Sequence, residues 1–133
     1  LHLLVVEDEQ DTRELITFIL ELSGATVTTV IHIYEALEAL DRFIPDALLS
    51  NIHLPDGDGY MMMELWREKE AELGIKPIPA IIIVDSAREV SRSRIHQSGF
   101  QTYVSKPFDV AEVVETVAKT ISDVKQGIRS EPH

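Results

Sequence analysis

The chain has 133 residues, 44% of them hydrophobic and 26% charged, which is typical of one soluble globular domain. No apolar run approaches the roughly 18 residues that a membrane span needs, and 23 acidic against 12 basic residues give a net charge of −11 that disfavours direct nucleic acid binding. The absence of cysteine excludes disulfides, thiolate metal sites and thiol catalysis, and leads us to expect a cytoplasmic location.

The first third of the chain alternates short apolar runs with longer amphipathic stretches. Residues 3–6 form a purely apolar run and predict a buried strand. Residues 10–23 carry apolar side chains at helical spacing and predict a helix. The segment 25–31 is rich in β-branched residues and predicts a second strand. Apolar residues spaced through 33–43 then predict a second helix, which ends before Pro45.

The same alternation continues through the middle of the chain. Residues 47–50 predict a third strand, followed by a turn rich in proline, aspartate and glycine. Residues 60–73 predict a third helix, and the apolar run 80–84 predicts a fourth strand. The mostly polar segment 88–98 predicts a fourth helix, and residues 102–104 predict a short fifth strand.

The last predicted element is a helix that follows Pro107 and keeps apolar residues at clean helical spacing as far as Ile121. Residues 122–133 are polar and lose this periodicity, so they predict a tail or linker. We therefore expect one domain over residues 1–121.

Five strands that alternate with five helices predict a doubly wound α/β fold, in which a parallel sheet has right-handed crossovers and helices on both faces. The strands lack polar alternation, as expected for a sheet that is buried on both faces. Ligands of such sheets bind at the carboxyl ends of the strands. The residues at or just after those ends are Glu7, Asp8, Asn51, Val84, Asp85, Lys106 and Pro107.

Each of these residues has an ordinary structural explanation when it is taken alone. The acids at 7–9 could favour the start of a helix, where the backbone dipole is positive. Asn51 could serve turn chemistry before Pro55, and Lys106 could be a solvated surface residue. The arrangement as a whole is more specific than any of its members.

This arrangement resembles the receiver domain of two-component response regulators. The resemblance covers residues 3–121 and rests on four motifs. They are Val-Val-Glu-Asp-Glu (5–9), Leu-Pro-Asp-Gly-Asp-Gly-Tyr (54–60), Ser-Gly-Phe (98–100) and Tyr-Val-Ser-Lys-Pro-Phe (103–108). The resemblance implies a flavodoxin-like fold with strand order 2-1-3-4-5.

The resemblance also implies a metal site and a phosphoryl acceptor. In the family, acids at the positions of Glu7 and Asp8 hold Mg²⁺, Asp8 directly and Glu7 mainly through water. The backbone carbonyl at His53 and the acceptor side chain at position 51 complete the protein's share of the coordination. Oxygen ligands of this kind are what Mg²⁺ prefers. The acceptor at the position of Asn51 is normally an aspartate that attacks a phosphohistidine of a partner kinase.

Further positions are implied to respond to the phosphoryl group. A hydroxyl residue normally stands at Val84 and a small residue at Asp85. Lys106 is implied to pair with the phosphoryl oxygens, and the Lys106–Pro107 peptide to be cis. Tyr103 corresponds to an aromatic residue whose rotamer reports the switch.

Two of the departures from the family pattern fall on the groups that touch phosphate. The neutral amide of Asn51 is no nucleophile for acyl phosphate formation and binds a divalent cation more weakly than a carboxylate does. Val84 lacks a hydroxyl, and Asp85 adds a negative charge that opposes an incoming anion. We expect Lys106 to lie near Asp8, and Mg²⁺ binding to be possible but weakened.

The leading hypothesis is a non-enzymatic pseudo-receiver of a two-component phosphorelay, which acts through protein–protein contacts. We expect a histidine kinase or another two-component protein, in cis or in trans, to bind residues 88–121. We expect no membrane contact and no binding of nucleic acid by this domain.

Two alternatives remain open from the residues alone. The chain could be an ordinary phosphoacceptor domain in which position 51 was altered by cloning, or in which Ser50 serves as a substitute acceptor. It could also be a small hydrolase that uses Glu7, Asp8 and Asp85 around Mg²⁺, although no nucleophile is visible among those residues.

Overall fold

The computed structural model describes residues 1–127, so the end of the predicted tail, residues 128–133, lies outside the described residues. The strands of the main sheet are β1 (His2–Val6), β2 (Thr26–Val30), β3 (Ala47–Asn51), β6 (Ala80–Val84) and β7 (Thr102–Ser105). The α-helices are α1 (Gln10–Leu22), α2 (Ile33–Ala39), α3 (Gly59–Leu73), α4 (Arg92–Ser98) and α5 (Val110–Lys125).

The five strands form one parallel sheet in the order β2-β1-β3-β6-β7, which confirms the predicted order 2-1-3-4-5. In the register of this sheet Leu4 of β1 lies between Thr28 of β2 and Leu48 of β3. The doubly wound α/β fold predicted from the alternation of strands and helices is therefore the fold that the chain adopts.

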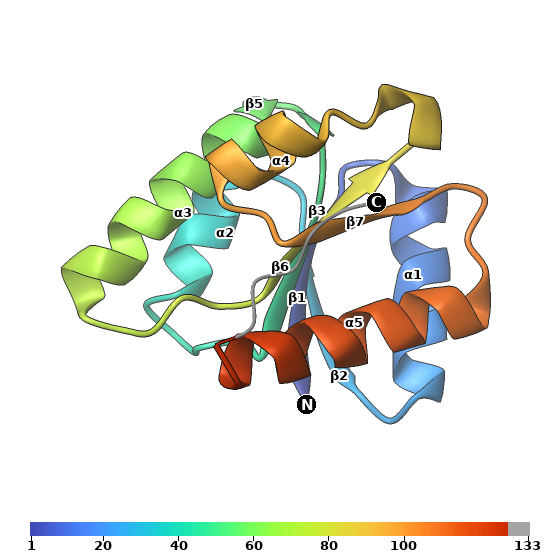
Figure 1. The fold of residues 1–133 in the computed structure, drawn as a ribbon, viewed down its shortest axis with the longest axis horizontal. Coiled ribbons are helices and arrows are strands. Elements are labelled where there is room, and N and C mark those ends of the chain that lie inside the picture. Colours follow the sequence, from blue (N-terminus) through green and yellow to red (C-terminus); the bar gives the residue numbers. More distant parts are fainter. Residues whose placement is uncertain (128–133) are drawn as a thin grey trace.

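Helices cover both faces of the sheet, as Figure 1 shows, with α2, α3 and α4 on one side and α1 and α5 on the other. Successive residues of β1 point into opposite cores, because side chains of a strand alternate between the two faces. Leu4 and Val6 pack with the first group of helices, whereas Leu3 and Val5 pack with the second. This explains the unbroken apolar runs of the central strands, at residues 3–6 of β1 and 80–84 of β6.

The predicted helix over residues 88–98 is wrong in its first half. Residues 87–89 form a short 3₁₀-helix, η1 (Ala87–Glu89), and α4 begins only at Arg92. The cause is local: the Ser86 hydroxyl accepts from the N–H of Arg88, and the Ser91 hydroxyl accepts from the N–H of Arg94. Serine side chains compete for backbone groups in this way, and Ser91 serves as the N-cap of a new helix.

The last helix is longer than expected. Helix α5 continues to Lys125, four residues past the predicted end of the domain at 121. Asp123 lies in the predicted tail but is buried, and its carboxylate accepts from Lys119 Nζ, one turn earlier, at 2.8 Å. The domain boundary itself stays a prediction.

Two shorter features complete the fold. The turn after β3 contains a two-stranded antiparallel ribbon, β4 (His53–Leu54) and β5 (Gly57–Asp58), that the sequence did not predict. None of the helices in residues 1–127 has the length and apolar character that crossing a bilayer requires.

A buried carboxylate joins α3 to the start of β6 and the end of α4. Glu70 is 3% exposed and accepts hydrogen bonds from Trp66 Nε1 at 2.9 Å and from the N–H of Ile78 at 2.8 Å. Arg67 forms an ion pair with this carboxylate at 2.8 Å and also donates to the carbonyl oxygen of Gly99 at 2.8 Å. The carboxylate is therefore both charge-paired and hydrogen-bonded, as burial requires.

Candidate functional site

The structure brings residues from two neighbouring strand ends together at the predicted pocket. Glu7 directly follows β1 and is fully buried, and Asn51 is the last residue of β3 and is 8% exposed. Asn51 Nδ2 donates to Glu7 Oε2 at 2.9 Å. The two positions that the sequence placed at one edge of the sheet are therefore in direct contact.

The amide of Asn51 makes two further hydrogen bonds. Nδ2 also donates to the carbonyl oxygen of His53 at 3.2 Å, and Oδ1 accepts from the N–H of Ile52 at 2.8 Å. Both ends of the amide are thus engaged within the chain. Sequence reasoning placed Glu7, Asn51 and His53 together but did not predict that the amide nitrogen faces the acid.

The acidic segment after β1 is held by the start of α1, as the ordinary explanation of these acids expects, and by an arginine that sequence reasoning missed. The Glu9 side chain is the N-cap of α1, where it accepts from the N–H groups of Asp11 and Thr12. Arg13 Nη1 donates to the backbone carbonyl oxygens of Glu7 at 3.0 Å and Asp8 at 3.2 Å. The only feature of the sequence that could have indicated these contacts is an arginine one turn into the predicted helix. Its hydrogen-bond partners cannot be predicted from residue spacing.

Burial raises the pKa of the Glu7 carboxyl above its usual value. The hydrogen bond from the Glu9 N–H to Glu7 Oε2, 3.2 Å long, and the charge of Lys106 act in the opposite direction. The carboxyl of Asp8 raises the pKa further, whereas the bond from Asn51 lowers it. The other oxygen, Oε1, is buried without a hydrogen-bond partner in the described residues. A carboxyl oxygen buried in this way calls for a nearby donor or cation.

Gly59 allows α3 to begin directly against the end of β3. A Cβ atom at Gly59 would lie 2.4 Å from the carbonyl oxygen of Asn51 and 3.2 Å from the Cα of Ile52. The N–H of Gly59 donates to the carbonyl oxygen of Ile52 at 2.6 Å. The glycine of the predicted turn motif is therefore required for the close packing of the backbone behind Asn51.

Lys106 does not take the partner that the sequence suggested. Its Nζ forms an ion pair with Asp85 Oδ1 at 3.0 Å, rather than with Asp8. Lys106 pairs with Asp85 because β6 and β7 are neighbours and the residues that follow them lie side by side. The Lys106–Pro107 peptide is cis, which confirms the geometry that the resemblance implied.

The two remaining switch positions lie on the same side of the sheet. Val84 ends β6 and is fully buried among the side chains that contact α2, α3 and α4. Tyr103 of β7 is half-buried and packs against the same cluster. Neither position offers an aliphatic hydroxyl toward the pocket at the end of β6, because the branched side chain of Val84 carries methyl groups only.

The residues of the pocket do not fit a Mg²⁺ ion of the kind that the family implies. Such an ion needs oxygen ligands in an octahedral arrangement. At position 51 the amide presents an N–H donor to Glu7, and its oxygen is turned to the Ile52 N–H. Within residues 1–127 no three His, Cys, Asp or Glu side chains are grouped so that they could hold a metal ion.

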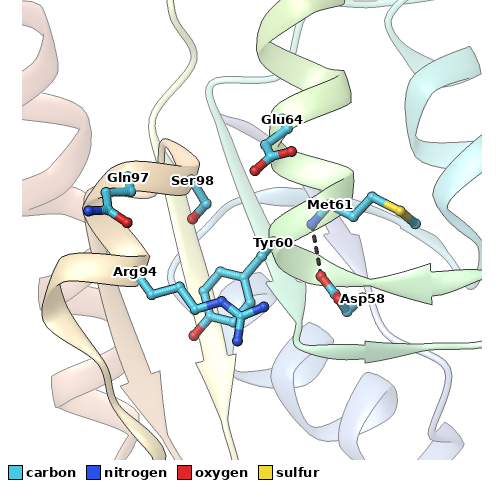
Figure 2. Close-up of a pocket in the computed structure, with 7 residues that line it drawn as sticks. All are labelled: Asp58, Tyr60, Met61, Glu64, Arg94, Gln97 and Ser98. Carbon is cyan, nitrogen blue, oxygen red and sulfur yellow. Dashed lines mark hydrogen bonds between the residues drawn. The ribbon is translucent and has the colours of Figure 1, made fainter.

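A hollow of about 250 Å³ opens between α3 and α4, and sequence analysis did not predict it (Figure 2). The guanidinium of Arg94 lies over the ring of Tyr60, 4.2 Å from its centroid. Burial raises the pKa of Tyr60 above its usual value. The lining residues are Asp58, Tyr60, Met61, Glu64, Arg94, Gln97 and Ser98.

Comparison with known proteins agrees with this fold. Residues 3–118 match the family described as "Response regulator receiver domain". The chain therefore belongs to the response regulator receiver domain family, whose members act in two-component signalling with histidine kinases and phosphotransfer proteins.

Individual relatives cover almost the whole chain. An uncharacterized 14.6 kDa protein in the sodA1 3′ region of Leptolyngbya boryana is 38% identical over 117 residues, which span 88% of this chain and 87% of that protein. The polar-differentiation response regulator DivK of Brucella anthropi is 30% identical over 120 residues, or 90% of this chain and 95% of DivK.

A solved structure bears on the metal site. The receiver domain of a sensor histidine kinase from Pseudomonas aeruginosa PAO1, crystallised with a magnesium ion coordinated in its active site cleft, is 29% identical. The two structures superpose with a TM-score of 0.79 over 91% of this chain and 97% of the other. Mg²⁺ binding is thus a property of that relative.

Proposed function

We propose that this chain is a receiver domain that does not accept a phosphoryl group at residue 51 and that signals through protein–protein contacts. The single observation that carries the proposal is the amide at position 51, hydrogen-bonded on both ends. An amide nitrogen whose lone pair is delocalised into the carbonyl cannot attack phosphorus as an ionised carboxylate oxygen does.

Two neighbouring positions support the same conclusion. Val84 has no hydroxyl with which to bond a phosphoryl oxygen, so the step that follows phosphorylation in the family lacks its donor. The Asp85 carboxylate is already paired with Lys106 at 3.0 Å, and its negative charge opposes an incoming anion. The missing acceptor is therefore accompanied by a missing hydroxyl at position 84 and by an added negative charge at position 85.

The neighbouring hydroxyl of Ser50 is a poor substitute acceptor. Ser50 is fully buried, and its Oγ donates to the carbonyl oxygen of Asn51 at 3.0 Å. An alteration of position 51 by cloning is a separate alternative, and the sequence of the natural gene at that codon decides it. That alternative would leave Val84 and Asp85 unexplained.

The proposed partner surface is the face formed by residues 88–121. It carries three exposed arginines, Arg88, Arg92 and Arg94, within seven residues of an otherwise acidic chain. Helix α4 itself contains no acidic residue. The hollow in Figure 2 opens beside this helix, so the face has both a distinct charge and a distinct shape. We infer a partner with an acidic contact surface, either a histidine kinase or another two-component protein, within the cytoplasm.

The test is to capture two-component partners with the domain, with and without a small phosphodonor and Mg²⁺. The proposal predicts that capture is unchanged by the phosphodonor and is lost in the triple variant R88E/R92E/R94E. The matched control is R42E/K76E/K125E, which makes the same change in net charge at exposed positions elsewhere. Capture that requires the phosphodonor, or that is lost equally in both variants, contradicts the proposal.

A further inference from the structure

The orientation of the Asn51 amide is determined by its partners. Its nitrogen faces two acceptors, Glu7 Oε2 and the His53 carbonyl oxygen, and its oxygen faces one donor, the N–H of Ile52. Turning the amide over would place its oxygen against the carboxylate and its nitrogen against another N–H group. Three hydrogen bonds would become repulsive contacts, so the hydrogen-bond network assigns the orientation.

This orientation uses up most of the groups that would otherwise ligate a cation. Of the four groups expected at the metal site, Glu7 Oε2, the His53 carbonyl and the Asn51 side chain are bonded to one another. A cation entering the pocket would meet only Glu7 Oε1 and the Asp8 carboxylate, both from the end of β1. The ligands that the β3 end would supply are already engaged.

We propose that the Asn51 amide takes the place of the divalent cation and cross-links the end of β1 to the loop after β3 through its two N–H groups. The acidic pocket is then assembled without metal. The inference deepens the proposed function and rests on it in one respect, namely that residue 51 is not needed as an acceptor. A neutral donor pair holds Glu7 Oε2 and the His53 carbonyl oxygen, two oxygens of the expected metal site, and no soluble ion is required.

Asp85 has a parallel role toward Lys106. Its carboxylate lies 3.0 Å from Lys106 Nζ, so the ammonium group has an anionic partner supplied by the chain itself. This pair is more exposed than the Asn51 network, with side-chain exposures of 26% for Lys106 and 55% for Asp85. It therefore contributes less to the assembly of the pocket than the buried amide does.

The chain offers a direct reporter, because Asn51 is its sole asparagine. Selective ¹⁵N labelling of asparagine gives a single side-chain NH₂ pair, observed by NMR while MgCl₂ is added to millimolar concentration. The inference predicts that this pair exchanges slowly with solvent and does not shift. In a uniformly ¹⁵N-labelled sample, the amide resonances of Ile52 and Glu9 are expected to be likewise unchanged. The thermal midpoint of the wild-type protein is expected to be independent of Mg²⁺.

The variant N51D supplies the positive control. It restores a carboxylate next to Glu7 and Asp8, and we expect it to gain a saturable, Mg²⁺-dependent rise in thermal midpoint. A saturable Mg²⁺ shift of the wild-type NH₂ pair, with a matching rise in wild-type Tm, overturns the inference. That result would not contradict the proposed absence of phosphoryl transfer to residue 51. A phosphoryl adduct on the wild-type protein would instead contradict the proposed function, and the NMR observations described here would be unchanged.

Discussion

The ammonium group of Lys106 pairs with the carboxylate of Asp85, whose position follows the neighbouring strand β6. Because both side chains are partly exposed, the variant D85A is expected to lower the free energy of unfolding by less than about 1 kcal/mol. The measurement is urea denaturation at low and at molar salt, where the Debye length falls to about 3 Å. A loss that is larger, or that persists unchanged in molar salt, would show that the pair is more than a screened surface contact.

Glu70 is expected to contribute far more to stability than any carboxylate of the pocket surface. The variant E70A leaves Arg67 without its charge partner and the donors of Trp66 and Ile78 without an acceptor. We expect the free energy of unfolding to fall by about 3 kcal/mol, the typical result of removing one member of a buried ion pair. Urea denaturation followed by circular dichroism measures this loss.

The matched control for this prediction is E68A on the same helix. Glu68 is exposed, so its replacement should change the free energy of unfolding by less than about 0.5 kcal/mol. Equal effects of E68A and E70A would mean that the Glu70 network contributes nothing beyond helix propensity.

Asp56 is expected to stabilise the fold in a pH-dependent manner. Burial alone would raise the pKa of its carboxyl. Hydrogen bonds from the N–H groups of Ile33 at 2.9 Å and Tyr34 at 3.3 Å act in the opposite direction. The lowering contributions outweigh burial, so the pKa lies below its usual value of 3.8. The folded protein therefore holds this proton less tightly than the unfolded chain does. The stabilisation is present above the usual pKa and is lost as the pH falls through the lowered value.

The variant D56N tests this dependence. Its urea midpoint should lie below that of the wild type at neutral pH, and the difference should shrink as the pH is lowered beneath 3.8. The control is E72Q, since Glu72 is exposed and lies in the last turn of α3. A difference between D56N and the wild type that is constant from neutral to acidic pH would exclude an ionised Asp56 as its cause.

Restoring the acceptor is expected to restore chemistry without restoring the switch. The variant N51D should take up a phosphoryl group from acetyl phosphate and Mg²⁺, because it again carries a carboxylate beside Glu7 and Asp8. Val84 still lacks a hydroxyl, so NMR signals of residues 88–98 should change little on phosphorylation. In N51D/V84T/D85A those signals should shift. Equal shifts in both variants would show that the hydroxyl at position 84 is dispensable.

The fold was predictable because its five strands are short segments of apolar or β-branched residues. Each of these segments formed a strand, and their alternation with amphipathic segments predicted a parallel sheet that the structure confirms. The errors fell where polar side chains replace apolar periodicity. Ser86 and Ser91 divide the predicted fourth helix, and the Lys119–Asp123 pair lies in the polar stretch where α5 continues to Lys125.

The candidate site was predictable as a set of positions but not as a set of contacts. The ends of β1 and β3 place Glu7 and Asn51 at one edge of the sheet, and this placement does not depend on their side-chain conformations. The sequence did not reveal that the Asn51 amide nitrogen faces Glu7 or that Lys106 pairs with Asp85. It also did not reveal that Arg13 donates to the backbone of the acidic segment after β1. Those choices depend on rotamers and on neighbours distant in the sequence, about which periodicity carries no information.

The most direct test of the central claim is the intact mass of the wild-type protein after incubation with acetyl phosphate and Mg²⁺. One phosphoryl group adds about 80 Da, and the modification carries close to two negative charges at neutral pH. The account predicts no adduct on the wild type under conditions in which N51D becomes modified. A stoichiometric, acid-labile gain of that mass on the wild-type protein would contradict it.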